Sequence, residues 1–242
     1  MAEENKAIDP LRAKVRIIHE KLALAYGQPT WRPHLDAISE VVSTILSQNT
    51  NDGNRDRAFS QLRAAFPTWE MVRDAPVEAI AAAINPAGLA PQKAPRIKQA
   101  LQFITAQRGT LDLDFLKDMP VQQAKEWLMQ IKGIGPKTAA IVLLFALGRP
   151  AFPVDTHIYR VTRRLGLVDP HASVEKAHEV LERLLDPEMY YAFHLNVIRH
   201  GREVCQARKP RCANCVLRDW CDYYHQNVAP QERHRQEHAG AP

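Results

Sequence analysis

The chain has 242 residues, a length that suits one large domain or two ordinary ones. Hydrophobic residues make up 45% of it and charged residues 24%, a composition that can bury a normal core and that excludes a disordered protein. The formal net charge of +5 favours an anionic partner without identifying one. The first ten residues are acidic and polar, unlike a secretory signal, and no apolar run approaches the roughly 20 residues of a membrane span. We therefore expect a soluble intracellular protein that does not use a membrane.

Helical patterns fill almost the whole chain. The first predicted helix begins with Asp9 as its N-cap and Pro10 in its first turn, and Gly27 ends it. The second predicted helix lies at about 34–48 and carries one apolar stripe of Ile38, Val42 and Ile45. Further helices are expected at about 55–65, 68–73, 76–84, 92–107 and 120–130.

The rest of the pattern supports the same fold class. No strand alternation of useful length and no repeat of fixed period is visible, so the sequence predicts an all-α fold. The end of the chain, residues 226–242, is polar and contains prolines, and we expect it to be a disordered tail.

All four cysteines lie within the stretch 205–221, at Cys205, Cys212, Cys215 and Cys221. Disulfides are rare inside cells, so metal ligation is the better interpretation of this cluster. Four-cysteine iron–sulfur sites and four-cysteine zinc sites use the same ligand type. Structural zinc usually takes two close cysteine pairs, whereas only Cys212 and Cys215 are close here. The spacing by itself leaves both metals open.

A second informative stretch, "LMQIKGIGPKTAAIVLLFALG" at 128–148, places Gly133 and Gly135 between two helical patterns. Pro136 suits the first position of the second helix, so the tight turn is Gly-Ile-Gly. Glycines let the backbone approach another molecule closely, and the free amides at the helix start can bind a phosphate. Ile131 and Ile134 should anchor the turn in the core. The simpler interpretation is a tight connection between two helices.

The pattern around this turn resembles the helix-hairpin-helix of base excision DNA glycosylases of the endonuclease III family. That family places a catalytic aspartate after the hairpin in a "VDTH" context, which Asp155 matches in this chain. It also ends with a [4Fe–4S] cluster whose cysteines have the spacing C-x6-C-x2-C-x5-C, and this chain has the same spacing. The resemblance covers roughly residues 10 to 225. It implies that the four cysteines hold a [4Fe–4S] cluster rather than zinc.

The resemblance also implies two catalytic residues. Lys137 occupies the position of the family's nucleophile, which attacks the sugar C1′ and forms a Schiff base. A helix N-terminus and partial burial in a closed pocket would both favour its uncharged amine. A phosphate contact is the alternative role for Lys137. Asp155 would stabilise positive charge on the sugar as the base departs, and its alternative role is a helix N-cap.

Further residues are expected to meet DNA. The family inserts a glutamine into the gap left by the flipped base, and Gln48 matches it, with Asn49 as the alternative because the loop aligns in two ways. Leu89, the apolar residue after Gly88, would fill the gap from the other side. Both loops have ordinary helix termination as their alternative.

Basic residues add to this expected surface. Arg208, Lys209 and Arg211 lie between the cysteines in a loop that should meet DNA phosphates. The helix after Asp155 carries three arginines opposite its apolar stripe: Arg160, Arg163 and Arg164. We expect them on a solvated or phosphate-facing side. His157 is expected to be a structural histidine.

We therefore interpret the chain as a bifunctional DNA glycosylase and AP lyase that removes oxidised pyrimidines. The alternatives are a related glycosylase for mismatched uracil or thymine or for oxidised guanine, or a non-catalytic hairpin protein that binds DNA. An adenine-mismatch glycosylase is disfavoured because that group lacks lysine at the position of Lys137. The partner would be double-stranded DNA with damaged bases or abasic sites, and the protein a monomer, nucleoid-associated in the cytoplasm if the source is bacterial or archaeal.

The resemblance implies two lobes with DNA between them. Residues 36–149 would form a helical barrel that contains the hairpin, and residues 8–27 with 150–225 would form the cluster lobe. The preferred lesion does not follow from the sequence.

Overall fold

A computed structural model describes residues 2–231, and it describes side chains from residue 9 onward. The chain divides into two compact units. One, here called the hairpin unit, comprises Arg32–Ala151, and the other, the cysteine unit, comprises the chain up to Trp31 together with the chain from Phe152. Helices form both units, and no strand occurs among residues 2–231, which confirms the predicted all-α class. No helix in this part of the chain is long and apolar enough to cross a membrane.

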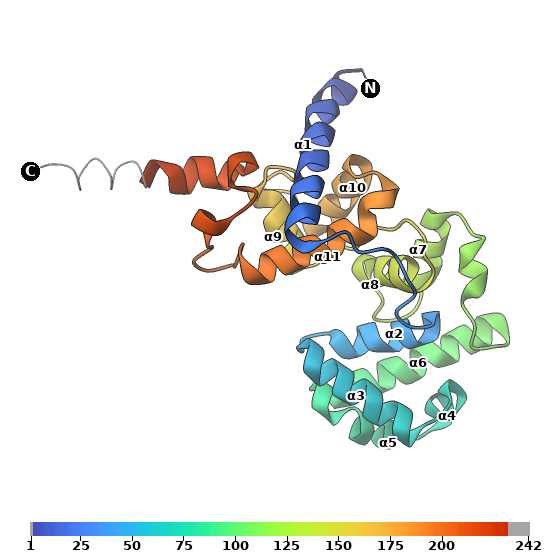
Figure 1. Cartoon of the computed structure of the whole chain (residues 1–242). Coiled ribbons are helices and arrows are strands. Elements are labelled where there is room, and N and C mark those ends of the chain that lie inside the picture. The colour runs from blue at the N-terminus through green and yellow to red at the C-terminus, as the bar shows by residue number, and fades with distance from the viewer. Residues whose placement is uncertain (1, 232–242) are drawn as a thin grey trace, which may run out of the picture. The chain divides into compact units, whose positions relative to one another are not determined.

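The helices of the hairpin unit follow one another with short connections (Figure 1). They are α2 (Ala37–Ser47), α3 (Asp52–Ala65), α4 (Trp69–Asp74), α5 (Val77–Ala83), η1 (Asn85–Ala87), α6 (Ala90–Arg108), η2 (Asp114–Lys117), α7 (Val121–Met129), α8 (Pro136–Ile141) and the π-helix η3 (Val142–Ala146).

The cysteine unit joins the N-terminal helix to the last part of the chain. Its helices are α1 (Ala2–Tyr26), α9 (Thr156–Arg164), α10 (Val174–Leu184), η4 (Pro187–Met189), α11 (Tyr190–Glu203), η5 (Cys212–Asn214), η6 (Arg218–Trp220) and the π-helix η7 (Tyr224–Val228).

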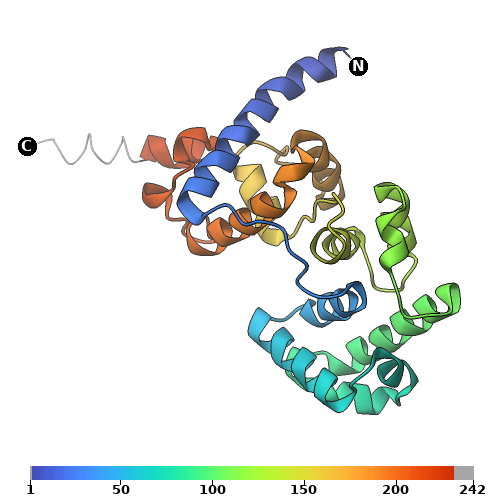
Figure 2. The same cartoon turned by 45° about the vertical axis from the view of Figure 1, so that its right-hand side comes forward.

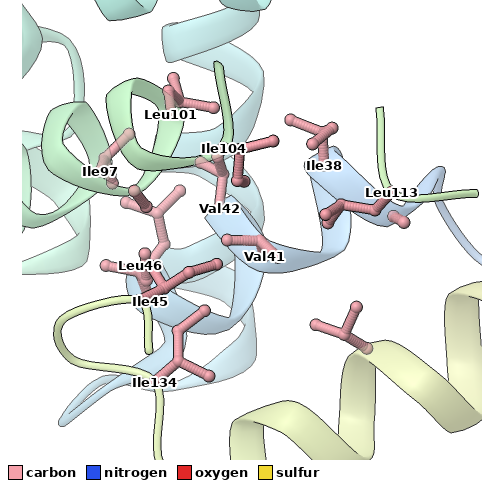
Figure 3. Close-up of a cluster of buried hydrophobic side chains, with 14 of the residues drawn as sticks. Ile38, Val41, Val42, Ile45, Leu46, Ile97, Leu101, Ile104, Leu113 and Ile134 are labelled. Carbon is pink, nitrogen blue, oxygen red and sulfur yellow. The ribbon is translucent and has the colours of Figure 1, made fainter. Parts of the chain in front are cut away.

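Helix α2 is the centre of the hairpin unit. Every residue from Ala37 to Leu46 is buried, so the helix is enclosed on all sides and not along the one predicted stripe. Figure 3 shows Ile45 and Leu46 of α2 beside Ile97 of α6 on one side and Ile134 of the hairpin turn on the other. Helices α4 and α5 also pack against α6, as the two views in Figures 1 and 2 show. The enclosure of α2 fixes the loop that follows it.

Helix α1 packs against α11 and α10 in the cysteine unit. Val15, Ile18 and Leu22 on one side of it are buried, whereas Leu11, which continues the same apolar stripe in the sequence, is half-buried. Gly27 ends the helix in the left-handed conformation with φ of 94°. The predicted start at residue 9 was wrong, because the helix begins upstream and contains Pro10. Proline removes only one helical hydrogen bond there, the bond to the carbonyl four residues earlier.

The end of the chain also differs from the expectation. Residues 226–231 continue helical structure after η7 begins at Tyr224, so the disordered tail predicted from residue 226 was wrong for these six positions. The remainder of that predicted tail, 232–242, lies outside the described residues.

Candidate functional site

The Gly-Ile-Gly turn connects α7 to α8 as the sequence predicts. Gly133 has φ of 92°, a left-handed conformation that favours glycine, and a side chain there would also approach Arg96. Gly135 is the N-cap of α8, and Pro136 is its first residue. Ile131 and Ile134 are buried in the core and anchor the turn, which confirms that prediction. Both glycines are exposed, so the backbone of the turn is accessible to a ligand.

Lys137 lies in the first turn of α8 and its side chain is exposed. The predicted partial burial of this lysine is therefore wrong for this structure. The hairpin core is filled by the isoleucines of the turn, and Lys137 points away from that core. An exposed primary amine beside free helix amides can meet an electrophile or a phosphate.

Asp155 precedes α9 and caps it. Its Oδ1 accepts a hydrogen bond of 2.7 Å from the backbone N–H of Ile158, and the residue is half-buried. Two positions further along, His157 contacts Arg160 through Nδ1, in keeping with its predicted structural role, and burial lowers the pKa of His157. Among the described residues the second carboxylate oxygen of Asp155 has no hydrogen-bond partner. Capping thus leaves one oxygen available for chemistry.

The loop after α2 carries Gln48 against the hairpin turn. The Gln48 amide donates to the Gly133 carbonyl at 3.3 Å, and its Oε1 accepts from Arg96 at 3.0 Å. Asn49 is exposed and has φ of 54°, in the left-handed region. The structure therefore ties Gln48, rather than Asn49, to the turn. Arg96 was not singled out by the sequence analysis, because its contact with Gln48 joins segments 48 residues apart.

Leu89 lies in the turn before α6 and is 48% exposed. Its φ of 51° is also in the left-handed region, which is uncommon for a residue with a branched side chain. Gly88 precedes it with φ of 66°. An apolar side chain held out of the core in a strained conformation is available to contact another molecule.

The four cysteines surround one cavity in the cysteine unit. All four cysteines line it together with Arg164. None of the four is in a disulfide. Burial, and then the neighbouring cysteines, raise the pKa of Cys215 to about 11, and burial raises that of Cys221. Thiols that disfavour one another's negative charge are suited to a multiply charged cation cluster, which would reverse this effect. No group of three or more His, Cys, Asp or Glu side chains in the described part of the chain is arranged to hold a single metal ion. The four cysteines instead stand around a shared cavity, as the ligands of a larger cluster do.

Two contacts next to this cavity did not follow from the sequence analysis, which placed Arg164 on a solvated or phosphate-facing side and did not name His200. Arg164 donates to Cys205 Sγ at 3.3 Å and to the carbonyls of Gln206 and Ala207. Buried His200 lies 3.5 Å from Cys215 Sγ through Nε2, and its Nδ1 is bonded to the Tyr26 hydroxyl at 2.9 Å. Burial lowers the pKa of His200 to about 4, so its ring is neutral at pH 7. Both contacts join distant parts of the chain.

The arginines of α9 correct an expectation. Arg160 donates to the carbonyls of Gly201 and Cys205, so it and Arg164 both bind the backbone that carries the first cysteine. Arg163 donates to the carbonyl of Pro170. All three are half-buried, so the expectation of a fully solvated side was wrong, and a phosphate-facing side stays a prediction. The position of these arginines opposite the apolar stripe could not show that the backbone at 205–207 packs on the same side of α9.

The loop between the first two cysteines presents its charges to solvent. Arg208, Lys209 and Arg211 are all exposed, and no shared carboxylate partner appears for them in the described part of the chain. Lys209 has φ of 52°. These three cations are therefore free to meet an anion.

Glu40 of α2 is a buried carboxyl that no motif indicated. It is 8% exposed, and its carboxyl has no hydrogen-bond or ion-pair partner among the described residues. Burial raises its pKa from 4.5 to about 7. It lines a polar cavity on the hairpin unit with His34, Ser43 and Arg55.

This carboxyl should make stability depend on pH. Because the pKa of Glu40 is higher in the folded state, its stabilising contribution is complete below pH 4.5 and is lost as pH rises through about 7. The shift corresponds to roughly 3 kcal/mol. Glu40→Gln should raise the thermal midpoint relative to wild type at pH 8 and give no such gain at pH 5. The control Glu126→Gln changes an exposed carboxylate of α7, and a gain equal to that of Glu40→Gln would contradict the assignment.

Comparison with known proteins places the chain in a family. Residues 42–187 match the model of the HhH-GPD superfamily of base excision DNA repair proteins, and residues 205–221 match the iron–sulfur binding domain of endonuclease III. The endonuclease III of Sulfolobus acidocaldarius is 36% identical over 80% of this chain and 85% of its own length. The chain belongs to the endonuclease III family of DNA glycosylases. As in the family, it carries a [4Fe–4S] cluster, and the cysteine-lined cavity fits that group.

Other relatives agree with this assignment. A putative DNA glycosylase of Arabidopsis thaliana is 38% identical over 72% of this chain, which spans 57% of the plant protein. Among solved structures, a non-covalent endonuclease III–DNA complex superposes with a TM-score of 0.76 at 25% identity, covering 93% of this chain and 98% of that one. A trapped covalent endonuclease III–DNA intermediate gives 0.74 at 25% identity, covering 88% and 97%.

The contact between Arg164 and Cys205 should influence the cluster of this endonuclease III family member. Hydrogen bonds to cluster sulfurs make the reduction potential more positive. Arg164→Met should therefore shift the potential to more negative values and lower the absorbance near 400 nm per protein, as the 205–207 backbone loses its support. Arg163→Met, one residue earlier, lacks any contact with a cysteine and is the matched control. Equal behaviour of the two variants would contradict a role for Arg164 beside the cluster.

Proposed function

We propose that this protein is a bifunctional DNA glycosylase and AP lyase that removes oxidised pyrimidines from duplex DNA. The observation that carries the lyase assignment is an exposed amine, Lys137, in the first turn after a glycine turn with accessible backbone amides. A monofunctional glycosylase needs no amine at this place, since it activates water. The proposal takes its substrate class from the family resemblance.

Lys137 is the proposed nucleophile. Its amine attacks C1′ of the damaged nucleotide as the bond from C1′ to the base breaks, and the base takes up a proton as it leaves. Loss of a proton and opening of the sugar give a Schiff base between Lys137 and C1′. Removal of a C2′ proton then expels the 3′ phosphate and breaks the strand. The exposed amides of the hairpin turn would hold a backbone phosphate nearby.

Asp155 is proposed to stabilise the positive charge that develops on the sugar. Its Oδ1 is committed to the Ile158 amide, so the charge-stabilising oxygen is Oδ2. Cys205, Cys212, Cys215 and Cys221 are the proposed cluster ligands. When bound, the cluster supplies a rigid support for the basic loop. The chain's own residues carry the chemistry.

Double-stranded DNA is the partner, and the protein is proposed to act as a monomer. Gln48 and Leu89 are proposed to fill the gap left by the flipped base, with Asn49 as the alternative to Gln48. The exposed positions of Leu89 and of the hairpin glycines support this role. Unstacking a base costs a few kcal/mol, which inserted side chains offset.

Binding to undamaged duplex should weaken steeply with salt. Each phosphate neutralised contributes a slope of about −0.9 in a plot of log affinity against log salt. Reversing the charges of Arg208 and Lys209 should flatten the slope by roughly two units. The matched control reverses Lys176 and Arg183 on α10, which are also exposed. A slope that stays unchanged after the loop reversal would remove the phosphate-binding role.

The function is tested by incubating the purified protein with a panel of duplexes. The panel carries oxidised pyrimidines, uracil or thymine opposite guanine, oxidised guanine, and an abasic site. We expect base release with strand cleavage for the oxidised pyrimidines and cleavage at the abasic site. Base release without cleavage would contradict the lyase, and preferred excision of a mismatched or purine base would contradict the substrate class.

A further inference from the structure

Lys93, in the first turns of α6, is the most completely buried charged residue of the hairpin unit, at 1% exposed. Its Nζ donates to two backbone carbonyls, those of Leu46 and Ala87, both at 2.8 Å. The structure shows no carboxylate paired with it in the described residues, and burial lowers its pKa. A buried ammonium without a counter-ion is costly, and an apolar residue would fill the same space at lower cost. Packing alone therefore does not account for a lysine at this position.

Each of the two carbonyls lies two residues before one of the proposed gap-filling residues. Leu46 lies two residues before Gln48, at the end of α2, and Ala87 lies two residues before Leu89, at the end of η1. Each carbonyl is thus at the base of one of the two loops that carry the proposed gap-filling side chains. The carbonyls at the end of a helix lack partners within it, so Lys93 also caps both ends.

Both loops contain a non-glycine residue with positive φ two or three positions beyond these carbonyls. Asn49 has φ of 54° and Leu89 has φ of 51°. Non-glycine residues keep such conformations only where the surrounding structure holds them. Lys93 is in contact with both loops, since its backbone N–H also bonds the Leu89 carbonyl at 3.0 Å. The Lys93 side chain therefore fixes the two strained turns relative to each other.

We propose that Lys93 is a positioning residue for base extrusion, which fixes the Gln48 and Leu89 loops relative to each other so that their side chains enter the duplex as one rigid pair. This inference rests on the gap-filling role proposed for those two residues. Without the bridge each loop would move independently, and the entropy lost on insertion would rise. Lys93 does not touch DNA in this account and acts only through the loops.

The test measures gap filling apart from general binding. A duplex carries a non-cleavable abasic analogue opposite 2-aminopurine, whose fluorescence reports its stacking. Lys93→Met, similar in length but unable to donate, should bind undamaged duplex within about twofold of wild type, because phosphate contacts are unaffected. It should bind the abasic duplex roughly tenfold more weakly and show a reduced fluorescence change.

The matched control is Lys98→Met on the same helix. Lys98 donates to the carbonyl of Ala75 at 2.6 Å and lies away from both loops, so its loss removes a similar bond without touching them. Lys98→Met should keep the fluorescence change. Equal loss in the two variants would show that Lys93 is merely structural and would overturn the proposal.

A double-mutant comparison tests whether Lys93 acts through Leu89. If it does, Lys93→Met combined with Leu89→Ala should be no worse than the more affected single variant. Additive losses would overturn the proposal. A Leu89→Ala variant that behaves like wild type would instead contradict the gap-filling role, and so identify the underlying assumption as the failure. If Lys93→Met does not fold, Lys93→Gln takes its place, because glutamine can still donate to one of the two carbonyls. Lys93→Gln is expected to give a fluorescence change between those of wild type and a protein without the bridge. A fluorescence change equal to that of wild type would contradict the bridging role of Lys93.

Discussion

Asp155→Asn is expected to lower base excision by on the order of 10²-fold or more, while binding to damaged duplex stays close to that of wild type. Asparagine is as good an N-cap as aspartate, so the bond from the Ile158 amide survives and α9 keeps its start. The substitution therefore removes the negative charge and little else. Single-turnover excision of an oxidised pyrimidine, with binding measured in parallel, checks this result.

Asp36→Asn provides the control. Asp36 is the N-cap of α2 and accepts from the Ser39 amide at 2.8 Å, so the same chemical change is made at the same structural position. Its excision rate should match wild type. If Asp155→Asn also excised normally, Asp155 would be a cap without a catalytic role. If it lost binding in proportion to activity, the carboxylate would support the fold or the complex and not the reaction.

Lys137→Gln is expected to abolish strand cleavage and still bind duplex containing an abasic site. Glutamine cannot form a Schiff base, so the covalent route from base release to β-elimination is closed. The hairpin amides and the loop around Arg208 remain to bind phosphates. Cleavage of abasic duplex, followed on a denaturing gel beside a binding titration, separates the two effects.

The hairpin offers its own control in Lys132→Gln. Lys132 is also exposed and stands five positions before Lys137, on the other side of the glycine turn. Loss of charge alone should therefore affect both variants similarly, whereas loss of cleavage should be confined to Lys137→Gln. Matching defects in binding, with cleavage lowered only in proportion, would reduce Lys137 to a phosphate contact.

Features carried by neighbouring residues could be predicted from the sequence. The turn at Gly133 and Gly135, the buried anchors Ile131 and Ile134 and the N-cap at Asp155 all depend on local patterns, and the structure shows them. The cysteine spacing is likewise local, and it agrees with the iron–sulfur domain match over 205–221. Motif patterns therefore sufficed for the family, and the family resemblance, not the cysteine spacing by itself, decided the cofactor.

Features that depend on contacts between distant segments could not be predicted. Lys93 reaches a carbonyl 47 residues away, and Arg164 reaches a cysteine 41 residues away. Lys93 does not stand out by type or spacing, and the place of Arg164 on α9 suggested a solvated or phosphate-facing side instead of a contact with a cysteine. The full enclosure of α2, which isolates Glu40, is also a property of the assembled helices and not of its own stripe. Each of these features depends on which segments pack together in the folded chain.

Trapping of the covalent intermediate tests the central claim most directly. Wild-type protein is mixed with duplex containing an abasic site in the presence of borohydride, which reduces a Schiff base to a stable amine, and the adduct is digested and sequenced by mass spectrometry. The account predicts one modified peptide with the DNA fragment on Lys137, and no adduct from Lys137→Gln. An adduct on a different amine, or undiminished trapping in Lys137→Gln, would contradict it.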